Sequence, residues 1–226
     1  MLIAARDVIK RYETADGPLA VLDGVSLTLD RGETLALTGE SGSGKSTLLH
    51  LLAALDTPDA GEVEIAGTPL STLDDTGRAA LRRERIGLVF QQFNLIPSLT
   101  AGDNLSFQAR LAGRHDPDWC ATLAKRLRIG EALARYPEQL SGGQQQRVAI
   151  GRALAARPAV LMADEPTGNL DEGSSAAVTD LMLELVAETG AGLLLVTHSE
   201  RLAARAARRL HLSGGRLTET LPRAAE

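Results

Sequence analysis

The segment GESGSGKS at residues 39–46 constrains the fold of this 226-residue chain more than any other feature. It fits the template G-x-x-x-x-G-K-[ST], and it separates a short apolar stretch at 35–38 from a helical pattern at 45–55. Glycines let backbone N–H groups turn inward around an anion, and the following helix presents its positive N-terminus to that anion. We therefore predict a strand–loop–helix unit that binds phosphate, rather than a Gly/Ser turn without a ligand.

The loop also carries the side chains that a nucleoside triphosphate requires. Lys45 is one of only three lysines among 24 basic residues, and its compact ammonium suits the β and γ phosphates where a planar guanidinium would not fit. Ser46 is the expected hydroxyl ligand of Mg²⁺, which takes hard oxygen ligands. The residues predicted to hold the phosphates are Gly39, Glu40, Ser41, Gly42, Ser43, Gly44, Lys45, Ser46 and Thr47. The loop alone does not separate kinases, GTPases, helicases and transporters.

The rest of the chain alternates between short apolar strands and helical patterns. Apolar stretches at 35–38, 86–90, 160–163 and 193–197 are separated by helical patterns, which indicates a parallel sheet covered on both faces. Ligands of such sheets bind at the carboxyl ends of the strands. The interval 98–156 is rich in helical pattern and is broken at its prolines. We predict an α/β fold in which 1–226 form one domain and about 98–156 form an inserted helical subdomain.

Composition excludes several other classes of protein. With 44% hydrophobic residues the chain is a globular protein, and its net charge of -5 argues against a nucleic-acid partner bound through a basic surface. The single cysteine, Cys120, excludes an intrachain disulfide. No apolar stretch approaches the roughly 18 residues of a membrane span, and the N-terminus has no signal-peptide pattern. Any membrane role is therefore expected to come through a partner.

A second glycine-containing helix start lies at 140–147, where the chain reads LSGGQQQR ahead of the helical pattern VAIGRALAA. Ser141 is a good N-cap, and Gly142 and Gly143 leave backbone N–H groups exposed at the start of the helix. The segment is thus a second helix N-terminus that can bind an anion. One chain that binds one nucleotide by itself does not need two such sites.

With this string the chain resembles the ATP-binding-cassette ATPases over nearly its whole length. The resemblance implies a phosphate-loop NTPase core with a mostly parallel sheet flanked by helices, a small antiparallel β part at the N-terminus and a helical subdomain carrying the signature motif. It also implies a head-to-tail dimer with a second copy of the chain. In that dimer the signature residues of one chain contact ATP held by the other chain; they are Ser141, Gly142, Gly143 and Gln144.

The segment VLMADEP at 160–166 places two carboxylates at the end of a buried strand. Asp164 and Glu165 would repel each other there without a cation, so a purely structural acidic pair is unfavourable. By the resemblance, Asp164 holds Mg²⁺ through water and Glu165 is the general base that polarises the attacking water.

The resemblance assigns four further positions. Tyr12 is the aromatic that stacks on adenine, with a surface tyrosine at a strand end as the alternative. Gln91, or Gln92 in the adjacent register, touches Mg²⁺ and the attacking water near the contact with the transmembrane subunit. His198 is the switch histidine that contacts the γ-phosphate. Asp171 belongs to the D-loop at 169–171, which crosses the dimer interface, and it also suits the N-cap of the following helix.

Three functions are compatible with these motifs. The first is the ATPase subunit of a membrane transporter, on the cytoplasmic side of the inner membrane beside integral permease subunits. The second, a chromosome-associated or ribosome-associated ATPase, is disfavoured because there is no long coiled-coil insertion and only one cassette. The third is an ATPase that regulates a membrane partner in cell-envelope remodelling without transporting cargo.

Within the family, three strings resemble the branch of lipoprotein-release and macrolide-export ATPases: QQFNLIPSLTAGDNL, LSGGQQQRVAI and ADEPTGNLD. The chain departs from the family pattern at two places. One is the sequence GDNL at 102–105, and the other is Gly151, where alanine is usual. Glycine inside a helix costs about 1 kcal/mol relative to alanine.

Overall fold

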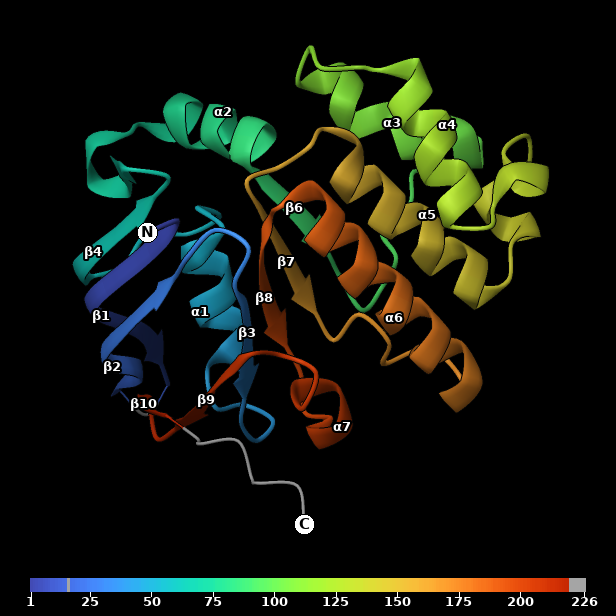
Figure 1. The fold of residues 1–226 in the computed structure, drawn as a ribbon. Helices are drawn as coiled ribbons and strands as arrows, with labels where there is room; N and C mark the ends of the chain where they lie inside the picture. The colour runs from blue at the N-terminus through green and yellow to red at the C-terminus, as the bar shows by residue number, and fades with distance from the viewer. Residues whose placement is uncertain (16, 220–226) are drawn as a thin grey trace. The chain divides into compact units, whose positions relative to one another are not determined.

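The computed structural model describes residues 1–15 and 17–219 (Figure 1). The chain divides into two compact units. The first unit combines Met1–Arg82 with Gly192–Glu226, and the second is Arg83–Ala191. The α/β class predicted from the alternating pattern is confirmed, because both units contain parallel strands and helices.

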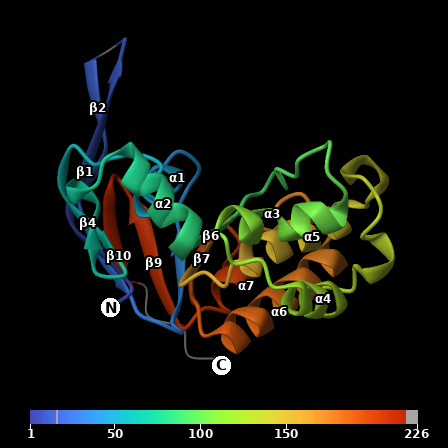
Figure 2. The same cartoon turned by 90° about the horizontal axis from the view of Figure 1, so that it is seen from above.

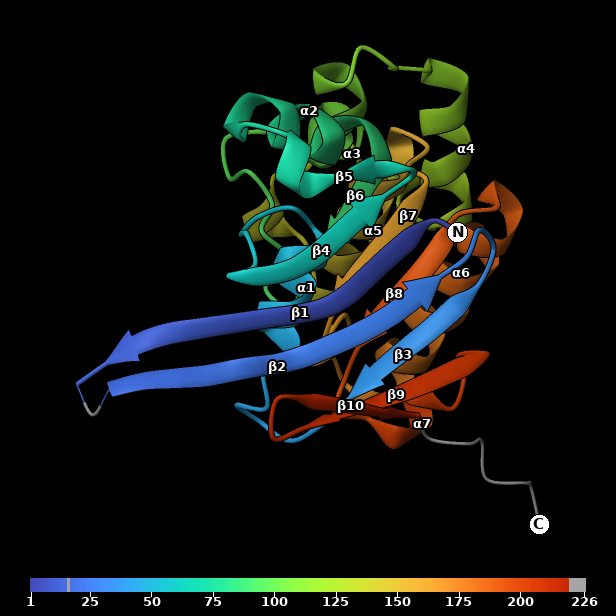
Figure 3. The same ribbon diagram turned by 90° about the vertical axis from the view of Figure 1, so that its left-hand side faces the viewer.

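The first unit contains an antiparallel sheet in the order β2-β1-β4-β5. The strands are β1 (Ile3–Thr14), β2 (Gly17–Leu29), β4 (Ala60–Ile65) and β5 (Thr68–Pro69). Ile3 of β1 pairs with Leu29 on one side and with Ile65 on the other, and all three side chains are fully buried. Strands β1 and β2 form the long hairpin that dominates Figure 3. The antiparallel β part expected near the N-terminus is therefore present.

The same unit contains the strand that leads into the phosphate loop. Strand β3 (Thr34–Thr38) lies between β8 (Gly192–Val196) and β9 (Arg208–Ser213) and is parallel to both, while β10 (Arg216–Glu219) pairs antiparallel with β9. The continuous apolar sequences of β3 and β8 are buried, as parallel strands require. Helix α1 (Lys45–Leu52) follows the loop, and the short α7 (Glu200–Ala203) follows β8. Helix α1 ends three residues earlier than predicted, and Ala54 beyond it has a φ of 55°.

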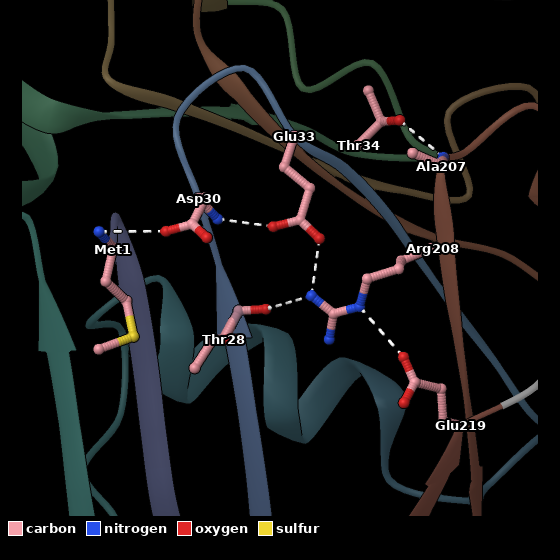
Figure 4. A network of polar contacts seen from close by, with 8 residues as sticks. All are labelled: Met1, Thr28, Asp30, Glu33, Thr34, Ala207, Arg208 and Glu219. Carbon is pink, nitrogen blue, oxygen red and sulfur yellow. Dashed lines mark hydrogen bonds and ion pairs between the residues drawn. The ribbon is translucent and has the colours of Figure 1, made fainter.

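Arg208 on β9 connects several segments of this unit (Figure 4). Its guanidinium donates to the Glu33 carboxylate at 2.6 Å, to the Thr28 carbonyl at 3.3 Å and to the Glu219 carboxylate at 3.3 Å. Nearby, the N-terminal ammonium of Met1 pairs with Asp30 at 3.1 Å. These contacts fasten the turn between β2 and β3 to β9 and thus hold the start of the strand that leads to the phosphate loop.

The second unit contains the parallel pair β6 (Ile86–Val89) and β7 (Val160–Asp164) together with four helices (Figure 1 and Figure 2). The helices are α3 (Ala101–Leu111), α4 (Pro117–Arg126), α5 (Gly142–Ala155) and α6 (Glu172–Thr189). Proline breaks the pattern as predicted, because Pro117 opens α4 and Pro137 opens a short 3-10 turn at Pro137–Gln139. Helix α2 (Asp75–Arg85) contains the boundary between the two units.

Gly151 in α5 has a packing reason that the sequence did not reveal. A Cβ atom at this position would lie 2.8 Å from Leu127 Cδ1 and 3.1 Å from Leu105 Cδ1 of α3. Glycine therefore lets the leucines of the neighbouring segments approach the α5 backbone closely, which offsets part of its lower helix propensity.

Among the helices of residues 1–15 and 17–219, none is both long and apolar enough to cross a membrane.

Candidate nucleotide-binding site

The loop between β3 and α1 adopts a backbone that requires glycine at two positions. Gly39 has a φ of 150°, and a Cβ there would lie 2.4 Å from the Leu212 carbonyl oxygen. Gly44 has a φ of 101°, and a Cβ there would lie 2.9 Å from Val21 Cγ1 and 3.0 Å from the Val21 carbonyl oxygen. The contacts at 2.4 Å and 2.9 Å are closer than a Cβ atom tolerates, and both residues have a positive φ that favours glycine, so the two template glycines are needed to form the loop.

Lys45 lies against the loop that precedes it. The residue is 9% exposed, and its ammonium donates to the carbonyls of Gly39 at 2.8 Å and Glu40 at 2.7 Å. The Ser43 hydroxyl is buried without a hydrogen-bond partner within the described residues. A buried ammonium beside an unsatisfied buried hydroxyl is a donor set that suits phosphate oxygens, so the loop fits a nucleotide phosphate group.

Tyr12 lies near the end of β1, where Asp56 and Lys10 contact its side chain. Its hydroxyl donates to Asp56 at 3.4 Å, and the Lys10 ammonium lies 5.5 Å from the ring centroid. Burial acts to raise the pKa of Asp56, but hydrogen bonds from Lys10 and the Thr57 backbone outweigh it and lower that pKa. Tyr12 itself remains 41% exposed, which leaves ring surface on which a base could stack.

His198 follows β8 and is exposed. The next residue, Ser199, caps α7 by accepting a hydrogen bond from the Leu202 N–H at 3.3 Å. His198 is therefore placed by the end of a buried strand on one side and by a capped helix on the other.

In the second unit, β7 ends on the predicted pair of carboxylates. Asp164 is the last residue of β7, and both Asp164 and Glu165 are partly buried. Glu165 has a φ of 45°, a left-handed conformation that costs a non-glycine residue on the order of 1 kcal/mol and is typical of functional sites. A turn follows, in which the Gly168 N–H donates to the Glu165 carbonyl at 3.0 Å.

The segment after β6 is joined to the segment after this turn. The Gln91 side-chain amide donates to Asn169 Oδ1 at 3.2 Å, and the Asn169 amide donates to the Gln91 carbonyl at 3.0 Å. The structure thus brings Gln91 together with a residue of the D-loop although 78 positions separate them.

The start of α5 has the predicted cap. Ser141 Oγ accepts a hydrogen bond from the Gln144 N–H at 3.3 Å, and Gln144 Oε1 accepts from the Ser141 N–H at 3.0 Å. This reciprocal capping box uses the Gln144 side chain locally, whereas Gly142 and Gly143 form the first turn of the helix. The N-cap prediction for Ser141 is confirmed.

Asp171 is the N-cap of α6, as predicted, because its carboxylate accepts a hydrogen bond from the Ser174 N–H at 3.0 Å. Hydrogen bonds from the Ser174 side chain and then from its backbone lower the pKa of this carboxyl. The cap fixes where the D-loop ends and α6 begins.

The predicted residues fall into two groups. The first unit holds Tyr12, the loop residues Gly39–Thr47 and His198, and the second unit holds Gln91, Ser141, Gly142, Gly143, Gln144, Asp164, Glu165 and Asp171. Within the described residues, no cluster of three or more His, Cys, Asp or Glu side chains offers a metal cage. Mg²⁺ usually keeps several waters and binds through one or two carboxylates plus substrate phosphates. The Ser46 hydroxyl of the first unit and the Asp164 carboxylate of the second unit are each of the hard-oxygen type that Mg²⁺ takes.

A family model described as "ABC transporter" matches residues 22–168. The chain belongs to this family. It is therefore an ATP-binding-cassette protein of a family that binds and hydrolyses ATP.

Relatives of this cassette protein include ATP-binding subunits of named systems. It is 49% identical over 221 residues to the uncharacterized ABC transporter ATP-binding protein YbbA of Escherichia coli K12, covering 96% of this chain and 97% of YbbA. It is 43% identical to the lipoprotein-releasing system ATP-binding protein LolD of Alcanivorax borkumensis, covering 96% of each chain. It is 45% identical to the macrolide export ATP-binding/permease protein MacB of Hyphomonas neptunium, covering 96% of this chain and 34% of MacB.

Solved structures of ATP-binding cassettes have the same fold as this chain. The ATP-binding cassette MJ0796, described as a dimer in a post-hydrolysis state bound to ADP and Pi, superimposes with a TM-score of 0.90 and 36% identity over 99% of this chain and 100% of that chain. The predicted fold class and the predicted resemblance to the lipoprotein-releasing and macrolide-exporting branch are thereby confirmed.

Two polar side chains of α5 were not singled out from the sequence. Gln146 and Arg152 point into the second unit and hydrogen-bond backbone carbonyls of the segments after β7 and β6. The sequence signal that could have found them is a polar residue at an inward-facing position of α5, where the other inward-facing residues are apolar.

Proposed function

We propose that this cassette protein hydrolyses ATP with the residues predicted from its motifs and that it drives a membrane exporter. The observation that carries the proposal is the loop at 39–46, which has a buried lysine turned toward its carbonyls at the start of α1. Backbone N–H groups, an ammonium and a helix N-terminus together favour a chain of phosphates.

Each predicted residue has a proposed role toward ATP. The residues at 39–47 hold the phosphates, with Lys45 neutralising the β and γ groups, and Tyr12 stacks on the adenine. Ser46 and Gln91 would offer oxygen ligands to Mg²⁺, and Asp164 would hold the ion through water; when bound, the ion would neutralise phosphate charge. His198 donates to the γ-phosphate. Phosphoryl transfer to water depends on positioning and charge neutralisation, and these side chains provide both.

Glu165 is the proposed general base. It accepts a proton from the water that attacks the γ-phosphorus, while the bond from that phosphorus to the oxygen of the leaving ADP breaks. Its position directly after the buried strand β7, in a left-handed backbone conformation, supports a fixed direction for the carboxylate.

The proposed partners are a second copy of the chain and integral permease subunits. We assign residues 1–226 to one ATPase domain whose Ser141, Gly142, Gly143 and Gln144 act on ATP bound by the second copy, with Asp171 at the interface between the copies. The names of the LolD and MacB relatives support export of a lipoprotein or another hydrophobic substrate. The complex would then place this chain at the cytoplasmic side of the inner membrane.

Replacing the proposed base tests the catalytic assignment. Glu165→Gln should bind ATP but lose roughly 10²- to 10⁴-fold in turnover, because a positioned general base contributes about that much. Steady-state phosphate release measures turnover, and Glu131→Gln, an exposed change of the same kind outside the site, is the control. Near-normal hydrolysis by Glu165→Gln would contradict the role of this residue.

The genes beside the coding sequence test the exporter assignment. A neighbouring gene for a large permease with a few spans and a large extracytoplasmic domain would support it. A neighbouring importer-type permease with a separate substrate-binding protein would contradict it.

A further inference from the structure

Gln146 is a buried amide in the helix that begins at the signature motif. The residue is 0% exposed and lies one turn beyond Gly142 in α5. Its Nε2 donates to the Pro166 carbonyl at 2.5 Å, across 20 positions of sequence. Pro166 directly follows Glu165, so this bond joins α5 to the residue next to the proposed base.

The carbonyl that Gln146 holds belongs to the turn after β7. The Gly168 N–H donates to the Glu165 carbonyl at 3.0 Å, which places Pro166 at the second position of a four-residue turn. The Pro166 carbonyl is part of the central peptide of this turn, and the orientation of that peptide distinguishes the common turn types. A buried donor against this carbonyl therefore selects one orientation of the turn.

The amide is not explained by stability alone. Within the described residues, Gln146 Oε1 is buried without a hydrogen-bond partner, and such an unsatisfied acceptor opposes folding. The Pro166 carbonyl can only accept, so the nitrogen of the amide must face it and the oxygen must lie on the other side. An apolar residue of similar length would avoid this cost, but it would leave the turn without its donor.

Glu165 depends on such support because its own backbone is strained. A φ of 45° at a non-glycine residue persists only where the surroundings hold it. The Gln146 bond fixes the peptide between Pro166 and Thr167, one residue beyond Glu165, while the buried strand β7 fixes the chain that enters Glu165.

We propose that Gln146 is a positioning residue that keeps Glu165 in the direction required for hydrolysis. The proposal rests on the proposed function of Glu165. Gln146 acts only through the turn at Pro166, without contact to ATP or to the attacking water.

Gln146→Met is the informative variant, because methionine matches the length of glutamine and removes both the donor and the unsatisfied oxygen. We expect its kcat for ATP to fall at least tenfold, with the KM and the ATP dissociation constant unchanged within about twofold and the melting temperature unchanged or higher. Gln108→Met, which replaces a half-buried amide on α3, is the matched control and should keep the wild-type kcat. Gln146→Glu, which presents an acceptor to the same carbonyl, should also lose kcat.

A double variant separates positioning from a general structural effect. If Gln146 acts through Glu165, the double variant Gln146→Met/Glu165→Gln should hydrolyse ATP as slowly as Glu165→Gln alone. Full multiplication of the two losses would overturn the proposal, as would a wild-type kcat for Gln146→Met or a fall in kcat that merely follows a loss of folded protein. If Glu165→Gln itself hydrolyses ATP normally, the proposed role of Glu165 as the base is wrong, and the positioning role of Gln146 is wrong with it.

Discussion

Lys45 is the residue whose chemistry is tied most closely to the phosphate loop. Lys45→Ala should weaken ATP binding by about 10- to 100-fold, because a hydrogen bond from a charged donor contributes about 1.5–3 kcal/mol. Isothermal titration calorimetry with ATP measures the dissociation constant. Lys125→Ala removes an exposed lysine on α4 and should leave that constant unchanged, whereas an unchanged affinity for Lys45→Ala would contradict its role.

The other lysines show what a residue pattern does not reveal. No sequence reason distinguished Lys10 from the many arginines, yet the residue is 8% exposed and pairs with Asp56 at 2.9 Å while donating to the Thr57 carbonyl at 2.8 Å. These partners lie more than 45 positions later in the chain, so only the fold brings them together. Lys125 is exposed, and nothing in the structure explains why it is lysine rather than arginine.

At the scale of elements, α5 connects the segments that follow both strands of its unit. Gln146 reaches the turn after β7, and Arg152 reaches the segment after β6, where its guanidinium donates to the carbonyls of Asn94 at 2.6 Å and Phe93 at 3.1 Å. Burial lowers the pKa of Arg152. The guanidinium nevertheless remains charged, because arginine does not deprotonate in proteins. The helix therefore holds the segment that follows Gln91 through a partly buried cation.

Arg152→Lys should destabilise this arrangement without removing the charge. A lysine ammonium lacks the planar fork that reaches two carbonyls at once, so we expect the free energy of unfolding to fall by about 1–2 kcal/mol. Urea unfolding measures the change. Arg110→Lys, at an exposed ion pair with Asp103, should change the midpoint little, and an equally stable Arg152→Lys chain would show that the fork is not needed.

The elements that the sequence predicted best are continuous apolar stretches. The buried strands at 35–38, 86–90, 160–163 and 193–197 were each located within about one residue of β3, β6, β7 and β8, because continuous apolar stretches are hard to mistake. Helix α2 was not predicted, since its sequence is mostly charged and none of its residues is buried. Strand β9 was also missed, because RRLHLS mixes charged and apolar residues at a partly exposed position.

For the whole molecule, motifs predict candidate residues for the site, but they do not predict the contacts between distant residues. The phosphate loop and the β7 carboxylates are local strings whose strand and helix context can be read from sequence. The pairs Gln91–Asn169 and Gln146–Pro166 depend on the packing of distant segments. The family match and the TM-score of 0.90 then extend the cassette fold over the chain as a whole.

The proposed trans arrangement requires that two copies assemble around ATP. In this proposal the signature residues of each copy act on ATP held by the other copy, so ATP should favour the dimer, and blocked hydrolysis should let that dimer accumulate. Glu165→Gln at saturating ATP should therefore elute at twice the 23.9 kDa monomer mass by light scattering, and it should return to the monomer when ATP is removed.

A variant that blocks only the interface sharpens this test. Adding Ser141→Arg places a long charged side chain at the N-cap of α5, so the double variant with Glu165→Gln should still bind ATP through its own phosphate loop but should remain monomeric. Dimerisation of that double variant would place the contact elsewhere on the chain. A Glu165→Gln chain that stays monomeric at saturating ATP would show that the two copies do not share their nucleotides, since nothing else in the proposal keeps them apart.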